Sequence, residues 1–193
     1  MIAPNLLHGE KVRLTAATHS DMPTVTRWWA DPAFLRLYNT APAAPRNEEQ
    51  LSRRFDLSQP SHDAFLFAVR PIDSDDLIGL LEFDGIDWLH RTTFVSIGIG
   101  EAAYRGRGYG REAMELGLAF AFNELNLHRV CLTVFGYNEP AIALYERLGF
   151  TREGVYREHL ERDGRRYDMY LYGLLRREWE RKRETTVIPN NKD

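Results

Sequence analysis

A chain of 193 residues with 44% hydrophobic side chains is long enough to build one sizeable core, and no Pro/Gly/Ser-rich linker divides it. Its 28 acidic and 25 basic residues give a formal net charge of -3, which disfavours a dominant nucleic-acid surface or a polybasic membrane anchor. The single cysteine, Cys131, excludes an intrachain disulfide and a cysteine-rich zinc site, and no apolar run has membrane-spanning length. We therefore expect one cytoplasmic domain over residues 1–193, with a core at about 10–179 and a flexible tail at 180–193.

The first half of the chain alternates strand-like and helix-like segments. Alternation of polar and apolar residues predicts strands, and capping residues next to proline predict helix ends. The expected elements are a strand at Lys11–Leu14, a helix from Ser20–Pro23 to Asp31–Pro32, a second helix from Asn47 through Phe55, and an antiparallel pair at Ala64–Arg70 and Leu77–Phe83.

The second half predicts a strand-helix-strand unit, a further helix and a closing hairpin. Asp84–Gly85 is expected to turn the chain into the strand Thr93–Gly100. The elements after it are an amphipathic helix with Ala113, Met114, Gly117, Leu118, Ala121, Phe122 and Leu125 on its core face, a strand at Arg129–Phe135, a helix between Asn138 and Gly149, and a hairpin of Val155–Glu161 with Arg165–Leu174. This order predicts an α+β fold, with helices flanking one mixed, mostly antiparallel central sheet.

The segment Tyr104–Arg111 joins an expected strand to an expected helix, and it contains three glycines and three arginines. A helix N-terminus offers unpaired backbone N–H groups, and glycines let a polyanion come close, so the segment suits a nucleotide or coenzyme pyrophosphate. A solvated glycine-rich turn is the alternative. The glycine spacing and the next strand do not fit a dinucleotide-binding fingerprint, and Gly110–Glu112 lacks the Lys-Ser/Thr of a Walker loop.

Two motifs in the same order resemble those of the GCN5-related N-acetyltransferases. Arg105-x-x-Gly108-x-Gly110 resembles the motif with which that family holds the pyrophosphate of acetyl-CoA, and Asn138–Phe150 resembles its Asn-x-x-Ala-x-x-x-Tyr-x-x-x-Gly-Phe segment. The resemblance covers about residues 10–179 and is nearest to the branch with ribosomal-protein N-terminal and spermidine acetyltransferases. It implies the acyl-CoA N-acyltransferase fold, in which the sheet is splayed at the coenzyme site.

The resemblance also implies roles for individual residues. Tyr145 matches the tyrosine that protonates the departing thiolate, although a tyrosine on the apolar face of a helix also suits a core position. Asn138 would contact the coenzyme as well as cap a helix. The residues implied to bind acetyl-CoA are Ile97, Gly98, Ile99, Arg105, Gly106, Arg107, Gly108, Tyr109, Gly110, Arg111, Asn138 and Tyr145, with an oxyanion donor among the backbone N–H groups of Ile97 to Ile99.

Glu82 is the candidate general base, because it is a carboxylate within an apolar strand, where burial would raise its pKa. Outward alternation on the strand explains it equally well. Asp84, Asp87 and His90 are lesser candidates for the base. By the resemblance, the acceptor pocket would be shaped by Trp28, Trp29, Tyr38 and Phe55.

These features predict an N-acetyltransferase that uses acetyl-CoA as co-substrate and acts on a primary amine, without a metal. The amine could be polyamine-like, antibiotic-like or a protein N-terminus. A non-catalytic acyl-CoA-binding regulatory module is the alternative, and a nucleic-acid-binding role is disfavoured by the net charge. We expect neither a nucleic-acid nor a membrane partner, and a homodimer stays open.

Overall fold

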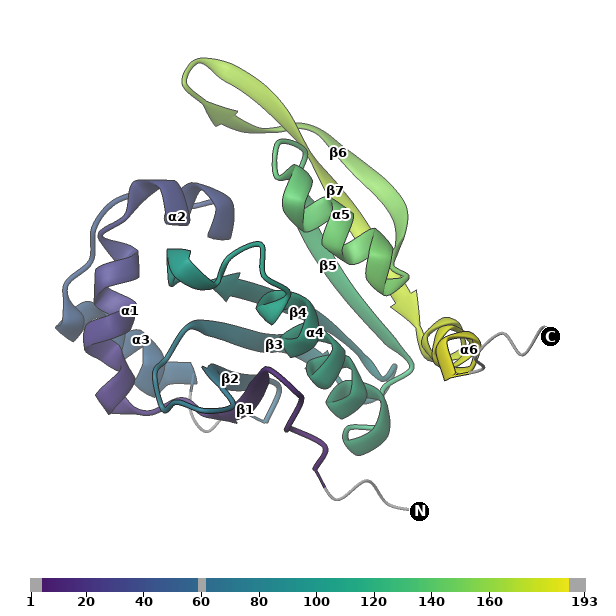
Figure 1. Cartoon of the computed structure of the whole chain (residues 1–193). Helices are drawn as coiled ribbons and strands as arrows, with labels where there is room; N and C mark the ends of the chain where they lie inside the picture. The colour runs from purple at the N-terminus through teal and green to yellow at the C-terminus, as the bar shows by residue number, and fades with distance from the viewer. Residues whose placement is uncertain (1–4, 59–61, 188–193) are drawn as a thin grey trace.

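The computed structural model describes residues 5–58 and 62–187 and has a seven-stranded open sheet at its centre (Figure 1). The strand order is β1-β2-β3-β4-β5-β7-β6, and all neighbours are antiparallel except β4 and β5. The strands are β1 (Val12–Ala16), β2 (Phe65–Pro71), β3 (Gly79–Asp87), β4 (Thr92–Ile99), β5 (Arg129–Phe135), β6 (Thr151–Arg162) and β7 (Arg165–Leu175). The sheet is mixed and mostly antiparallel, as the sequence predicted.

Helices cover both faces of this sheet. They are α1 (Met22–Trp29), α2 (Pro32–Tyr38), α3 (Glu48–Ser58), α4 (Tyr109–Ala119, continued by a π-helical turn at Phe120–Glu124), α5 (Glu139–Leu148) and α6 (Arg176–Val187). Side chains of α1, α2 and α3 form one core with the Leu80 face of the sheet, whereas α4, α5 and α6 form a larger core on the Leu81 face. None of the helices in these ranges is both long and apolar enough to span a bilayer.

The sheet is splayed between β4 and β5. These parallel strands pair only from Thr92 to Phe94 on β4 and from Arg129 to Cys131 on β5. Both strands continue beyond the last pair, so the β5-facing edge of β4 from Val95 to Ile99 has no strand partner in the described chain. Helices α4 and α5 lie on either side of the gap that opens where β4 and β5 diverge (Figure 1).

Close packing holds α4 on the sheet. The core face predicted for this helix is buried, apart from the half-buried Leu125. A Cβ built on Gly117 would lie 2.8 Å from Leu81 Cδ1, so glycine allows the helix to approach β3. Strand β4, helix α4 and strand β5 form the predicted strand-helix-strand unit, and the two strands pair in parallel over a short stretch.

Helix α2 was not predicted. Asp31–Pro32 was predicted to end a helix, but the same dipeptide also starts the next one. Asp31 caps α2 by accepting a hydrogen bond from the backbone N–H of Ala33 at 2.9 Å, and Pro32 occupies the first turn, where its missing N–H costs nothing. In the described part of the connection between β1 and β2, the α-helices therefore number three rather than the two predicted.

The turn expected at Asp84–Gly85 is also wrong. Strand β3 continues to Asp87, and its register with β4 shifts between Asp84 and Asp87. Gly85 has a φ of 57°, which glycine adopts without the strain of a side chain, so the dipeptide forms a bulge within the strand. The chain reverses after Asp87 instead.

Candidate active site

The glycine-rich segment lies where the sequence predicted it, between the end of β4 and the start of α4. Gly106 and Gly108 have φ values of 70° and 90°, and Gly108 is the N-cap residue of α4. These left-handed conformations are open to glycine and strained for other residues. The segment thereby turns the chain tightly and brings the first N–H groups of α4 to the mouth of the gap.

The three arginines of this segment have different surroundings. Arg105 reaches back and donates hydrogen bonds to the carbonyls of Ile99 (2.8 Å) and Gly100 (2.6 Å), which ties the loop to the end of β4. Arg107 donates to the carbonyl of Ala103 at 3.2 Å. Arg111 forms an exposed ion pair with Glu115 on the next turn of α4, at 2.9 Å.

A tie to the N-terminal segment fixes the same loop from behind. The carboxylate of Glu112, in the first turn of α4, accepts backbone hydrogen bonds from Glu10, Lys11 (2.8 Å) and Val12 (3.2 Å). Lys11 Nζ in turn donates to the carbonyl of Arg107 at 3.2 Å. A charge-assisted set of this kind holds the start of α4 against the N-terminal edge of the sheet. Lys11 and Glu112 were not predicted from the sequence, because about a hundred residues separate them.

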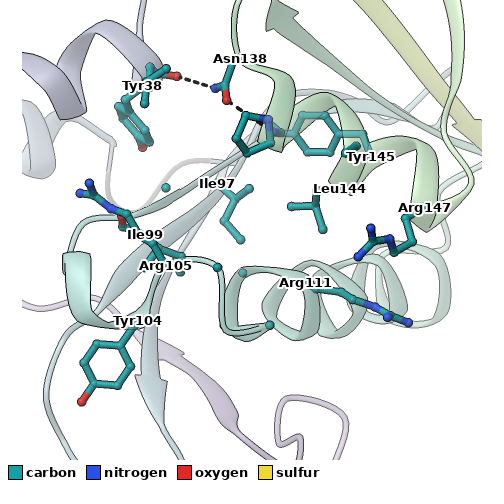
Figure 2. Close-up of a pocket in the computed structure, with 18 of the residues that line it drawn as sticks. Tyr38, Ile97, Ile99, Tyr104, Arg105, Arg111, Asn138, Leu144, Tyr145 and Arg147 are labelled. Carbon is teal, nitrogen blue, oxygen red and sulfur yellow. Dashed lines mark hydrogen bonds between the residues drawn. The ribbon is translucent and has the colours of Figure 1, made fainter.

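Helix α5 forms the opposite wall. Asn138 caps it, since its side chain accepts from the backbone N–H of Ala141 at 3.3 Å, and Gly149 ends it with a φ of 101°. Both signals were predicted from the sequence. The helix turns Leu144 and Tyr145 toward Ile97 of β4 across the gap (Figure 2).

Together the two walls enclose a groove of about 540 Å³. Its lining comes from four segments: Phe34, Leu37 and Tyr38 of α2; Ile97, Gly98 and Ile99 of β4; Tyr104, Arg105, Gly106, Gly108, Gly110 and Arg111 of the loop and α4; and Asn138, Pro140, Ala141, Ala143, Leu144, Tyr145 and Arg147 of α5. Of the predicted coenzyme residues, only Arg107 and Tyr109 are not part of this lining. Apolar side chains occupy the middle of the groove and cationic ones its ends.

Helix α2 closes the groove at one end. The ring of Tyr38 stacks on Phe34 with centroids 5.1 Å apart, and both rings cover Gly98. A Cβ on Gly98 would lie 2.6 Å from the Tyr38 ring, so glycine at this position lets α2 dock on β4. Asn138 Nδ2 donates to the carbonyl of Leu37 at 3.4 Å, which links α5 to α2 (Figure 2).

Tyr145 is 7% exposed and packs edge-on against Phe150, with ring centroids 5.9 Å apart. Burial raises the pKa of its phenol to about 12, because the charged form would lose its hydration. The hydroxyl is therefore protonated throughout the neutral range. Such a group can donate a proton at the groove, but it cannot act as a base there.

Glu82 lies on the face of the sheet that α1 and α3 cover, half-buried and opposite Ser96 of β4. It lines a small cavity with Trp29, Phe55 and Tyr38, and Tyr38 also lines the large groove. Glu82 thus lines the small cavity and not the groove, and Tyr38 is a residue that the two cavities share. The alternation of residues along the strand had not decided whether the Glu82 side chain points toward the site or away from it.

The other predicted base candidates lie outside both cavities. Asp84 lies at the surface, but partial desolvation of its carboxyl group, together with the nearby charge of Asp63, raises its pKa. Asp87 accepts a hydrogen bond from the backbone N–H of His90 at 2.8 Å, as a turn residue would. Within residues 5–58 and 62–187, no three His, Cys, Asp or Glu side chains are grouped as a metal site requires.

Phe34 and Arg147 line the groove but were not predicted, and the sequence carries only weak signals for them. Phe34 lies four residues before Tyr38, which was predicted for the acceptor pocket, and both follow an Asp-Pro helix start, so the spacing places Phe34 on the same helix face. Arg147 is two residues after Tyr145 and reaches the open end of the groove near Arg111 (Figure 2). Its position on α5 could have been inferred from the helix alone.

Comparison with known proteins agrees with this geometry. The family model described as the Acetyltransferase (GNAT) domain matches residues 11–151. The N-acetyltransferase YokL of Bacillus subtilis is 33% identical over 137 residues, which are 70% of this chain and 75% of the relative. The N-acetyltransferase p20 of Bacillus licheniformis is 27% identical over 179 residues, covering 90% and 97% of the two chains.

A solved structure shares the fold over most of the chain. The spermidine N-acetyltransferase from Vibrio cholerae, crystallised with CoA and spermine, superposes with a TM-score of 0.82 over 89% of this chain and 99% of its own, at 24% identity. The family match and the relatives establish more than the fold. This chain belongs to the GCN5-related N-acetyltransferase family and is an acetyl-CoA-dependent N-acetyltransferase.

Proposed function

We propose that this chain acts as a single acetyltransferase domain that acetylates a small, polyamine-like primary amine, which attacks the thioester of acetyl-CoA directly. The observation that carries the proposal is the groove of about 540 Å³ between the splayed β4 and helix α5. Protein N-termini and antibiotic-like amines are the competing acceptors.

The groove offers a suitable environment for each part of the coenzyme. The backbone N–H groups of Gly106, Gly108 and Gly110 and the N-terminus of α4 would bind the pyrophosphate, with Arg111 and Arg147 supplying charge. Ile97 and Leu144 would contact the apolar part of the pantetheine arm. The unpaired edge of β4 leaves backbone groups available to its amides.

Two relatives support a polyamine-like acceptor. The spermidine N(1)-acetyltransferase of Vibrio cholerae is 35% identical over 100 residues, which are 52% of this chain and 57% of that enzyme. The spermidine acetyltransferase of Escherichia coli is 38% identical over 76 residues, or 39% of this chain and 40% of the relative. The carboxylate of Glu82 beside the groove favours a cationic acceptor as well.

The acceptor amine must be deprotonated before it can attack the thioester. An alkyl ammonium with a reference pKa of about 10.4 has no lone pair to attack with, so it must lose a proton first. Glu82 would accept that proton, directly or through a water molecule, after Tyr38 shifts or through a path beside it. The carboxylate would also orient the ammonium while it is still charged.

The transition state has two further needs. The oxygen of the attacked carbonyl gains negative charge, which a backbone N–H of Ile97 to Ile99 on the free edge of β4 would stabilise. The departing thiolate takes a proton, and Tyr145 would donate it from the wall of the groove. The phenol regains its proton from solvent between turnovers.

The Glu82→Gln variant tests the base. We expect kcat/KM for the amine to fall by about 10²-fold at neutral pH, because the amide cannot accept the proton. The rise of kcat/KM with pH should move toward the pKa of the free amine. Asp84→Asn is the matched control, since this carboxylate lies on the same strand and lines neither cavity. Equal activities and pH profiles for Glu82→Gln and the unaltered chain would refute the assignment.

An acceptor panel tests the substrate class. Thiol release from acetyl-CoA is measured with spermidine, an aminoglycoside and a peptide with a free N-terminus. We expect the largest kcat/KM for spermidine. Turnover confined to the peptide or to the aminoglycoside would replace the polyamine proposal with that class.

The cysteine content agrees with a cytoplasmic location. Cys131 is buried as a free thiol, and burial raises its pKa, with the hydrogen bond from Arg129 acting in the opposite direction. A buried, protonated thiol needs no disulfide partner and suits a reducing compartment.

A further inference from the structure

Arg162, the last residue of β6, contacts a segment more than a hundred residues away in the sequence. Its Nη2 lies 3.5, 3.1 and 3.2 Å from the carbonyl oxygens of Asn39, Thr40 and Ala41. These residues follow directly after α2. Three successive carbonyls therefore converge on one guanidinium, and no other side chain in the described ranges donates a hydrogen bond to them.

The guanidinium is held there at a cost. Its Nε is buried and has no hydrogen-bond partner within residues 5–58 and 62–187. Leaving a buried donor unsatisfied is unfavourable, because the group loses its hydration without gaining a partner. The backbone contacts of Nη2, which are charge-assisted, offset that cost.

Neighbouring contacts fasten the last turn of α2 to the same side of the molecule. Asp163, next to Arg162 in the hairpin turn, forms an ion pair with Arg36 at 2.6 Å. The hydroxyl of Tyr137, before α5, donates to the carbonyl of Arg36 at 2.6 Å. Helix α2 and the tip of the hairpin lie close together in Figure 1.

The segment held by Arg162 determines where Tyr38 lies. Tyr38 ends α2, immediately before Asn39, and its ring covers Gly98 of β4. The same side chain lines both the coenzyme groove and the cavity that contains Glu82. A displacement of residues 39–41 would carry Tyr38 with it and change the wall between the two cavities.

We propose that Arg162 is a positioning residue for the acceptor amine. It holds the Asn39–Ala41 segment, and thereby Tyr38, in the place that shapes the acceptor side of the site. Arg162 does not line the groove, so acetyl-CoA binding does not depend on it directly. The inference rests on the proposed function, because it requires an amine acceptor at the cavity that Tyr38 and Glu82 line.

Arg162→Ala and Arg162→Lys are the test variants, and the acceptor KM and the coenzyme Kd are measured separately. We expect Arg162→Ala to raise the acceptor KM at least tenfold and to change the Kd of CoA, measured by calorimetry, less than twofold. Arg162→Lys should recover part of the acceptor affinity, because an ammonium can donate to the same carbonyls. A merely structural role would weaken acceptor and coenzyme binding together.

Arg166→Ala is the matched control. Arg166 lies in the same hairpin and forms an exposed ion pair with Glu161 at 2.8 Å, so its loss should leave the acceptor KM unchanged. Asp163→Asn keeps a turn-forming residue and removes the ion pair with Arg36, and we expect a smaller rise in acceptor KM, at most threefold. This variant keeps the inference testable if Arg162→Ala does not fold.

The outcomes separate the inference from the proposed function. An unaltered chain that acetylates no amine in the panel overturns the proposed function and, with it, the acceptor role of Arg162. Turnover by the unaltered chain with the same acceptor KM in Arg162→Ala overturns the inference alone. A parallel loss of coenzyme and acceptor affinity also overturns it.

Discussion

Tyr145 and Tyr172 are both buried tyrosines, and desolvation is the first cause that raises the pKa of each to about 12. They differ in their surroundings. Tyr145 lines the groove, whereas the hydroxyl of Tyr172 donates to Glu146 at 2.8 Å and does not reach the groove. Variants of the two tyrosines can therefore be compared to distinguish the chemical role of a buried phenol from its contribution to stability.

Tyr145→Phe should lower kcat by about 10²-fold, because the thiolate would leave without a proton from the protein. The Kd of acetyl-CoA should change little, since the ring still packs on Phe150. Rates are measured by thiol release at saturating substrates. Because the phenol stays protonated below about pH 12, Tyr145 should not cause a decline of kcat in the neutral range.

Tyr172→Phe is the control for that prediction. It should reduce the stability of the fold, because Glu146 loses a hydrogen bond, and leave kcat within a few-fold of the unaltered chain. Ionisation of the two phenols should also make the stability of the fold depend on pH. Their folded-state pKa lies above the unfolded value of about 10, so their contribution to stability is present below pH 10 and is lost as the pH rises toward 12. If the two variants lost kcat equally, Tyr145 would have no special role as the acid.

At the scale of the element, the loop between β4 and α4 depends on left-handed glycines. Gly106 has a φ of 70° and Gly85, in the β3 bulge, a φ of 57°, and a Cβ on either would meet no atom within 4 Å. Alanine at each position therefore introduces backbone strain without a steric clash. Gly106 lines the groove, whereas Gly85 does not.

Gly106→Ala and Gly85→Ala should each destabilise the fold by about 1–2 kcal/mol, measured by urea unfolding. Only Gly106→Ala should weaken CoA binding, by about tenfold or more, because the strained loop would no longer present its N–H groups to the pyrophosphate. Weakened binding in both variants would mean that general destabilisation, rather than loop geometry, controls affinity.

Elements with strong local signals were predicted well. Asn47 and Gln50 cap α3 reciprocally at 3.1 and 2.9 Å, and Asn138 and Gly149 bound α5, as the residue types indicated. Helix α2 was missed because one Asp-Pro dipeptide carries both a stop and a start signal. Such ambiguity is resolved by the packing of Phe34 and Tyr38 on β4, which no local pattern contains.

At the scale of the whole molecule, the described sheet has two parts, which are joined only by a seam, the short pairing of β4 with β5. Strands β4 and β5 share three residue pairs, and the groove opens beyond them. A ligand that contacts β4, α4 and α5 at once would bridge the two parts. Coenzyme binding is therefore expected to stabilise the molecule across the seam.

CoA at 100 times its Kd should add about 2.7 kcal/mol to the free energy of unfolding and raise Tm by roughly 5–10 °C. Hydrogen exchange should slow at Ile97–Ile99 and in the first turns of α4 and α5, because these elements line the groove. Gly106→Ala should show a smaller rise in Tm at the same CoA concentration. Protection confined to β1 and β2, away from the groove, would contradict the bridging.

Most strands and helices, apart from α2 and the bulge in β3, could be read from local patterns, because caps, glycines and periodicity act over a few residues. The same holds for the glycine-rich segment before α4. The acid role of Tyr145 was implied by the family resemblance and stays a prediction. Long-range packing decided the rest. It determined on which side of the sheet Glu82 lies, how α2 covers Gly98, and that Arg162 and Glu112 hold segments about a hundred or more residues away. The spacing of residues along the chain does not encode which distant segments meet, because that choice depends on how both cores pack around a splayed sheet.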